Sequence, residues 1–224
     1  MEKRGKLIQC LVCIAVFALA TTTTSMANLL TDPGAENATT APNPNPTSIP
    51  GWSFFNGAAF SSAFAHSGTN SLGDVGGGGF QVPGDYQQFA ATAGQQFTMT
   101  GFALTPTAIA GGANFGQLQI TFFSGPNGTG SDIGTVETGG VGAKASAQVN
   151  STSPVGVWIP LSVTATAPAG AQSMQAFTIV IDQNATAVYF DDLTLDLIPE
   201  PSTIAMTLTG LLGLVAFGWK KRRV

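Results

Sequence analysis

The stretch Gln117-Leu118-Gln119-Ile120-Thr121-Phe122 alternates polar and apolar side chains without a break. Successive side chains of a β-strand point to opposite faces, whereas the faces of a helix repeat every 3.6 residues. The stretch therefore predicts a half-buried strand with Leu118, Ile120 and Phe122 facing a core.

The same pattern extends along the chain in both directions. Clear strand signals lie at 71–75, 86–92, 97–102, 157–165, 174–181 and 187–198, and weaker ones at 28–30, 52–55, 58–64 and 145–149. Turns rich in Gly, Pro, Asn and Ser separate them, and no segment has a helical period, an internal repeat or heptads. Short strands at this spacing predict an all-β fold, an antiparallel β-sandwich.

The N-terminus has the layout of a signal peptide. Three cations at positions 3, 4 and 6 precede an apolar run from 7 to 20, and Ser25-Met26-Ala27 places small residues before a cleavage site. This pattern predicts a signal peptide, helical in its apolar part, at 1–27, removed by signal peptidase between Ala27 and Asn28.

The C-terminus has a different tripartite layout. Pro199-Glu200-Pro201 precedes an uncharged apolar segment from 203 to 219, which is followed by the four cations at 220–223. At 1.5 Å per residue this segment forms a helix of about 25 Å, which spans a core of roughly 30 Å with local thinning. The four cations then stay in the cytoplasm.

Residues 199–224 resemble the PEP-CTERM sorting signal of bacterial exosortase substrates. The resemblance implies that exosortase, a membrane-embedded protease, processes the chain near Pro199-Glu200-Pro201. The C-terminal transmembrane helix is then a temporary tether to the inner membrane. The alternative is a permanent single-span anchor. In both cases residues 28–198 are exported, to the cell surface or beyond.

The exported segment 28–198 is long enough for one domain with a real core. Cys10 and Cys13 lie in the signal peptide, so the domain contains no disulfide. It has ten acidic residues and one basic residue, Lys144, which gives a net charge of −9. This charge excludes nucleic acid and anionic lipid as partners and is compatible with calcium or a neutral polymer.

The order of landmarks in this segment resembles the jelly-roll carbohydrate-binding modules, which are galactose-binding-like sandwiches. The landmarks are 28–36 (NLLTDPGAE), Gly51-Trp52, 65–72 (AHSGTNSL), 93–98 (AGQQFT), 158–162 (WIPLS) and 188–193 (VYFDDL). The family usually has an aromatic residue at the position of Ala35. The resemblance implies a jelly roll and extracellular polysaccharide as a partner.

In similar sandwiches, an acid of the first turn and an acid of the last strand converge on a structural Ca²⁺. The resemblance therefore implies calcium ligands at Glu36, Asp191 and Asp192. The period of two along the last strand predicts that Asp191 shares the core face with Tyr189. A carboxylate buried there needs a cation or several donors. Carboxylates satisfied by backbone N–H groups and water are the alternative.

Two tryptophans are candidates for stacking on the C–H face of a sugar. Strict alternation puts Trp158 on the outer face of its strand, although Pro160 can mark a bulge that returns it inward. Trp52 opens an aromatic stretch. Packing at the rim or in the core is the alternative for both residues, and it is the more common role of tryptophan.

No catalytic residue is assigned. His66, the one histidine, lies in a Ser-Gly turn, where a structural role is favoured over that of a general base. One histidine and no cysteine cannot complete a zinc site, and no Gly-x-Ser-x-Gly elbow occurs. We therefore expect a non-enzymatic surface or matrix protein that binds or organises exopolysaccharide. The alternatives are a structural matrix protein without a ligand and, less favoured, a glycan hydrolase, which needs two carboxylates in a cleft.

Overall fold

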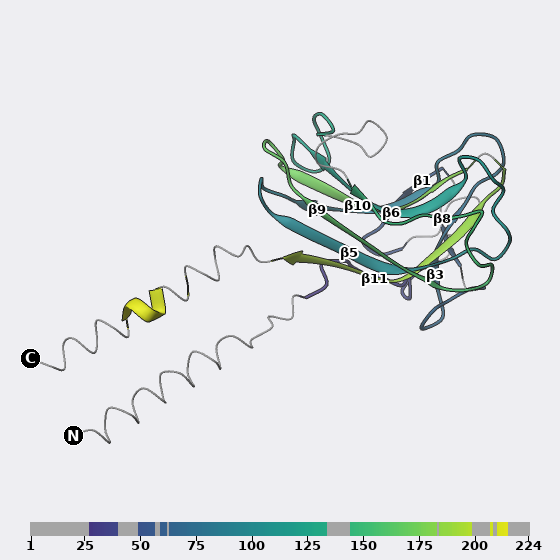
Figure 1. The fold of residues 1–224 in the computed structure, drawn as a ribbon, viewed down its shortest axis with the longest axis horizontal. Coiled ribbons are helices and arrows are strands. Elements are labelled where there is room, and N and C mark those ends of the chain that lie inside the picture. Colours follow the sequence, from purple (N-terminus) through teal and green to yellow (C-terminus); the bar gives the residue numbers. More distant parts are fainter. Residues whose placement is uncertain are drawn as a thin grey trace, which may run out of the picture.

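The computed structural model describes residues 27–39, 49–56, 59–61, 63–133, 144–182, 184–198, 207 and 210–214. Its β-strands form two antiparallel sheets packed face to face (Figure 1). Sheet 1 has the order β1-β4-β10-β6-β7, with β8 also paired to β6. Sheet 2 has the order β2-β3-β11-β5-β9. The predicted antiparallel sandwich is confirmed.

The predicted strands other than 28–30 are present, with 145–149 divided into two short strands, and the long ones begin within about two residues of the expected positions. Their bounds are β1 Ser53–Phe55, β2 Ala59–Ser61, β3 Ser71–Val75, β4 Gly84–Ala90, β5 Gln96–Leu104, β6 Phe115–Phe123, β7 Lys144–Ala145, β8 Val149–Asn150, β9 Ile159–Thr166, β10 Ser173–Ile181 and β11 Ala187–Ile198. The predicted strand at 28–30 is not one of them, although the N–H of Leu29 donates to the carbonyl of Leu195 over 2.9 Å.

The core lies between the two sheets, and the alternation on β6 is confirmed. Leu118, Ile120 and Phe122 are fully buried, as the pattern predicted. The sheets approach closely at Gly116, where a Cβ atom would lie 2.8 Å from the side chain of Val188 on β11. The buried hydrophobic cluster runs from Leu30 to Leu195, so the core of the sandwich is built within residues 28–198.

The predicted core face of β11 is wrong in its first half. The pairing of β11 with β5 shifts between Asp191 and Thr194, which is a β-bulge, and Asp192 adopts a φ of 50° there. A bulge adds one residue to a strand and reverses the phase of its side chains. Tyr189 and Asp191 therefore point away from the core. The core residues of this strand are Val188 and Phe190 before the bulge and Leu193 and Leu195 after it.

The predicted signal peptide and most of the predicted sorting segment lie outside the described residues. Of the C-terminal segment, residues 207 and 210–214 are described, and they are helical. Within the described part of the chain, no helix has the length and apolar character needed to cross a membrane.

Candidate functional site

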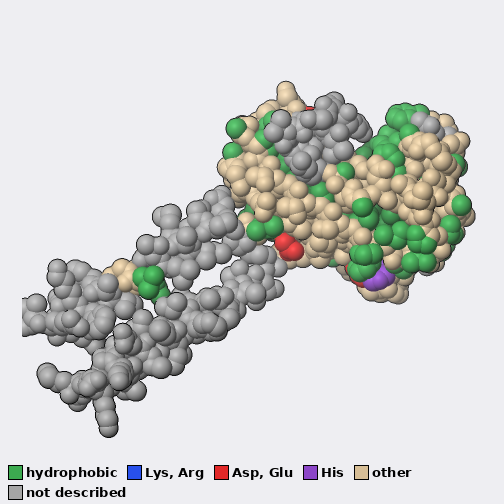
Figure 2. All heavy atoms as spheres, in the orientation of Figure 1, with side chains coloured by type: hydrophobic (Ala, Val, Ile, Leu, Met, Phe, Trp, Pro, Cys, Tyr) green, Lys and Arg blue, Asp and Glu red, His purple; other side chains and the backbone are tan. Residues whose placement is uncertain are grey.

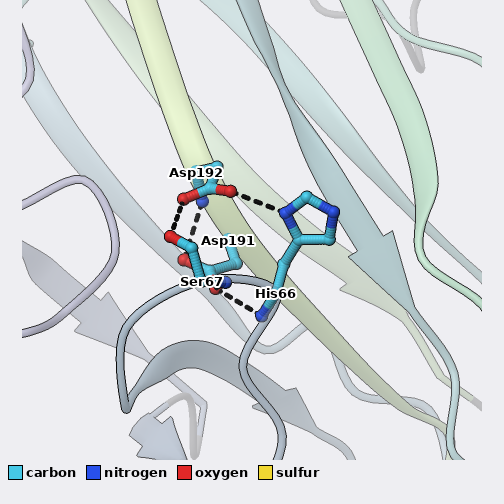
Figure 3. A network of polar contacts seen from close by, with 4 residues as sticks. All are labelled: His66, Ser67, Asp191 and Asp192. Atoms are coloured by element: carbon cyan, nitrogen blue, oxygen red, sulfur yellow. Dashed lines mark hydrogen bonds and ion pairs between the residues drawn. The ribbon is translucent and has the colours of Figure 1, made fainter.

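The three predicted calcium ligands meet at one loop, residues 66–70. Figure 3 shows two of them, Asp191 and Asp192, with His66 and Ser67 of this loop. Asp191 is fully buried beneath this loop. Its Oδ2 accepts the N–H groups of His66 at 2.7 Å and Ser67 at 3.1 Å, and its Oδ1 accepts the N–H of Asp192 at 2.7 Å. Burial raises the pKa of Asp191, although these three donors oppose the rise.

Asp192 points to the outer side of the same loop. Its Oδ2 lies 2.6 Å from His66 Nδ1, and its Oδ1 accepts the Ser67 hydroxyl at 2.5 Å (Figure 3). Burial raises the pKa of Asp192, but the hydrogen bonds from Ser67 and His66 and the charge of His66 outweigh it, so the pKa is below its ordinary value. The bulge thus directs Asp191 to backbone N–H groups and Asp192 to the side chains of His66 and Ser67.

Glu36, from the first turn, anchors the other end of the loop. Its carboxylate accepts the N–H of Thr69 at 3.0 and 3.1 Å, the Thr69 hydroxyl at 2.8 Å and the N–H of Asn70 at 3.1 Å. Burial raises its pKa, but these hydrogen bonds outweigh it and lower the pKa overall. Gly68 has a φ of +64°, and a Cβ there would lie 2.2 Å from Glu36 Oε1, so only glycine fits.

The donor set around these acids does not fit a cation. The oxygens of Glu36 and Asp191 already accept seven N–H and O–H hydrogen bonds, and positive hydrogens occupy the directions that Ca²⁺ would need. Within the described ranges, no three His, Cys, Asp or Glu side chains are grouped so that they could hold a metal ion. Calcium binding stays a prediction, and the contacts favour its alternative, carboxylates satisfied by backbone donors.

This alternative gives a direct test. We expect the thermal midpoint of residues 28–198 to be the same in 5 mM EDTA as in 5 mM CaCl₂, because hydrogen bonds already compensate the buried carboxylates. Differential scanning fluorimetry measures both midpoints, and MgCl₂ controls for ionic strength. A midpoint several degrees higher in CaCl₂ alone would restore the calcium site.

Ser67, His66 and Asp192 have the composition of a catalytic triad but not its arrangement. In a triad the serine Oγ bonds to the imidazole nitrogen that the acid does not contact. Here Ser67 Oγ bonds to Asp192 instead, so the carboxylate holds both partners. This geometry cannot activate the serine, and it supports the structural role predicted for His66.

Trp52 is not available for sugar stacking. It is 6% exposed and belongs to the core, and its Nε1–H donates to the carbonyl of Asp32 over 2.9 Å. The prediction of Trp52 as a ligand-binding residue is therefore wrong. The hydrogen bond to Asp32 fixes the indole to the first turn.

Trp158 lies at the start of β9 and is partly exposed. Its ring meets His66 edge-on with centroids 5.5 Å apart, and His66 stacks on Phe102 at 3.9 Å. Phe102 lies between the buried residues Gly101 and Ala103 on β5, so it points outward. Trp158 is therefore on the outer side of sheet 2, where strict alternation placed it. Figure 2 shows hydrophobic side chains beside the histidine on this surface.

Sequence reasoning missed a second aromatic group, on the outer side of sheet 1. Phe55, Tyr86 and Phe177 are partly exposed, and their ring centroids lie 5.4 to 6.3 Å apart. Gln88 and Gln175 adjoin them, and the amide of Gln175 donates to Gln88 Oε1 over 3.1 Å. We call these five residues the aromatic–amide face. Figure 2 shows a hollow in the surface above sheet 1, with hydrophobic side chains on its flank.

The register explains how this face forms. Gln88 pairs with Gln175, and Tyr86 pairs with Phe177, across β4 and β10. On β6 the outward row is also polar but it is buried: Gln117 Nε2 donates to Gln119 Oε1 at 3.2 Å, and Gln119 Nε2 donates to Thr121 Oγ1 at 3.0 Å. The signal in the sequence was the polar half of the opening stretch, whose apolar half alone was assigned a role.

Comparisons with known proteins agree with both the tail and the fold. Residues 197–223 match the PEP-CTERM protein-sorting motif, which implies an exported exosortase substrate with a cell-surface or extracellular destination. No curated protein matches the sequence.

The fold is similar to solved carbohydrate-binding modules and to parts of larger enzyme chains. A tandem of two CBM22 domains from Paenibacillus barcinonensis Xyn10C matches with a TM-score of 0.50 and 17% identity over 81% of this chain and 48% of that one. An arabinose-bound GH51 α-L-arabinofuranosidase matches with a TM-score of 0.51 and 14% identity, over 77% of this chain and 26% of that one. The enzymatically active domain of tailspike protein 4 from bacteriophage CBA120 matches with a TM-score of 0.50 and 12% identity, over 76% of this chain and 21% of that one. The chain thus spans only a fifth to a half of these proteins, and the likeness is one of fold.

Proposed function

We propose that this protein is an exported, exosortase-processed, non-catalytic matrix protein that binds neutral extracellular polysaccharide on its aromatic–amide face. The observation that carries the proposal is the juxtaposition of three partly exposed rings with the amides of Gln88 and Gln175 on the outer side of sheet 1. The sorting motif at 197–223 supports the extracellular setting. The transmembrane helix tethers the chain before processing.

The chemistry of this face suits an uncharged sugar chain. A pyranose ring has an apolar C–H face that packs on aromatic rings and a rim of hydroxyl groups that exchange hydrogen bonds with amides. Each glutamine amide both donates and accepts, so the pair Gln88 and Gln175 can satisfy hydroxyls of either sense. With ten acids against one base, the domain repels an anionic polysaccharide.

Five acids of the domain are held in ways that do not suit hydrolysis. A glycosidase needs two accessible carboxyl groups on either side of the scissile bond. Asp74, Asp85 and Asp191 are fully buried, and Glu36 and Asp192 are bonded to the loop at 66–70. These positions favour a binding role over a catalytic one.

Affinity electrophoresis of residues 28–198 in gels containing soluble xylan, galactan, β-glucan or dextran tests the proposal. We expect retardation by at least one of these neutral polysaccharides, and a roughly fivefold weaker affinity for Phe177→Ala, because the loss of one stacked ring costs about 1 kcal/mol. Leu29→Ala, which trims a 38% exposed apolar side chain beside β11, is the matched control and should bind like the wild type.

Two results would contradict the proposal in different ways. If the wild type binds none of the four polymers, the structural matrix protein without a ligand becomes the better reading. If Phe177→Ala and Leu29→Ala bind equally, the ligand lies elsewhere on the surface.

A further inference from the structure

A second group of aromatic side chains lies on the opposite side of the sandwich. His66 stacks on Phe102, Trp158 meets the edge of His66, and Phe64 lies against Tyr189 with ring centroids 4.8 Å apart. Tyr189 points outward, because its neighbours Val188 and Phe190 are fully buried in the core. We call the five aromatic residues of this group the histidine face.

The histidine face has its own polar group for orienting a ligand. Asp192 Oδ2 contacts His66 Nδ1, so the imidazole is held with its other nitrogen, Nε2, directed away from the carboxylate (Figure 3). The side chains of His66 and Asp192 are 31% and 35% exposed. A ring nitrogen and a carboxylate beside an indole and a phenol can meet both the hydroxyl rim and the C–H face of a sugar.

We propose that the domain binds two polysaccharide chains at once, one on the aromatic–amide face and one on the histidine face, and thereby cross-links them. The inference rests on the proposed function, which needs only the first face. It assigns the protein a mechanical task in the matrix, because a bivalent binder joins polymers into a network whereas a monovalent binder only coats them.

The placement of the two faces requires two chains. Each face is the outer surface of a different sheet, and the buried residues of both sheets lie between them. Packed sheets are about 10 Å apart, and side chains on their outer surfaces point in opposite directions. A polysaccharide bound along one face therefore cannot contact the other face. The other face must bind a second polysaccharide chain.

The charge of the chain favours the same occupant on both faces. The one basic residue of the segment 28–198 is Lys144, on β7 of sheet 1, and the charged side chain that contacts the histidine face is the anion Asp192. An anionic polymer or a membrane of anionic lipid would be repelled, so an uncharged glycan is the partner that fits. The histidine face has no pair of amides, and we therefore expect it to be the weaker of the two.

A two-layer capture assay tests the proposal on residues 28–198. The neutral polysaccharide that retards the protein most in the gels is immobilised on a sensor surface and saturated with protein. The same polymer, in soluble and fluorescent form, then flows over the layer. The first step reports binding, and the second reports bivalency. We expect the wild type to capture the soluble polymer and Leu29→Ala to do the same.

The variants separate the faces. Phe177→Ala disables the aromatic–amide face and Trp158→Ala disables the histidine face, and Tyr189→Ser is a second variant of the latter should Trp158→Ala unfold. We expect each to retain the first layer at saturating protein and to lose at least 80% of second-layer capture. Phe177→Ala combined with Trp158→Ala should lose both layers.

The outcomes distinguish this inference from the proposed function. First-layer binding without capture by the wild type overturns cross-linking and leaves the proposed function standing. Full capture by both Trp158→Ala and Tyr189→Ser, in protein that melts like the wild type, would show that the histidine face does not hold the second polysaccharide chain. That result also overturns cross-linking. Absence of first-layer binding to every polymer overturns both proposals.

Discussion

Replacement of Asp74 by Asn is expected to stabilise the domain at pH 8 and to flatten its pH dependence. Asp74 on β3 and Asp85 on β4 belong to different sheets, and both are fully buried. None of their four carboxylate oxygens has a hydrogen-bond partner, and the hydroxyl of Thr178, opposite Asp85 on β10, has none either. Two acids face each other here inside the core.

Burial and mutual repulsion keep these acids protonated. Burial raises the pKa of Asp74 to about 7, from an ordinary value of 3.8. Burial, and then the charge of Asp74, raise the pKa of Asp85 well above the same value. Below about pH 4 both acids are protonated in the folded and unfolded chains, so they cost nothing. As the pH rises toward 7 the unfolded chain ionises first, and the free energy of unfolding falls.

The size of the effect follows from the shift. For Asp74 the shift corresponds to a cost on the order of 4 kcal/mol at pH 8, at about 1.4 kcal/mol per pH unit. An asparagine at this position has no charge to bury, and its amide can donate to Asp85. It also removes the charge that raises the pKa of Asp85. We therefore expect Asp74→Asn to gain about 4 kcal/mol at pH 8 and less, on the order of 1–2 kcal/mol, at pH 5.

Urea denaturation of residues 28–198 at pH 5, 6, 7 and 8 measures this dependence. The range avoids the acid region, where Glu36 and Asp192, whose pKa values are lowered, lose their stabilising contributions as they protonate. Asp196→Asn, at a partly exposed position on β11, is the control and should keep the wild-type slope. Equal slopes for wild type and Asp74→Asn would show that the pair is not protonated at neutral pH.

Replacement of Asp191 by Ala is expected to cost at least 3 kcal/mol and to release the loop at 66–70. The carboxylate accepts three backbone N–H groups, from His66, Ser67 and Asp192. Its removal leaves these donors without their acceptor in a partly buried place, and each unsatisfied donor costs about 1–3 kcal/mol. In a domain of this size the thermal midpoint should fall by about 6 °C or more.

Two measurements check this result. Thermal unfolding gives the loss of stability, and hydrogen exchange at the amides of His66 and Ser67 reports the loop directly. Asp196→Ala, which removes a carboxylate from the same strand, should change neither. If Asp191→Ala melts like the wild type, the carboxylate is not what fixes the loop to β11.

The sequence predicted the sandwich because its strands alternate, and alternation is a local property of the chain. It predicted Glu36, Asp191 and Asp192 as a group through a resemblance, and the loop at 66–70 does gather them. It failed on the phase of β11, because the bulge after Asp191 depends on pairing with β5 and leaves no local mark. It failed on Trp52 for a similar reason, since burial depends on what packs against the ring.

The aromatic–amide face was likewise predictable only in part from the sequence. The polar positions of β4, β6 and β10 were readable as outward-facing, but the neighbours of each depend on strand order, and β4 and β10 are far apart in the chain. The sequence by itself determined the sorting motif, the charge and the inward side chains of most strands, because these depend on residue type and spacing. Only the tertiary structure decided which outward side chains meet, and it placed aromatic groups on both sides of the sandwich and two acids between the sheets.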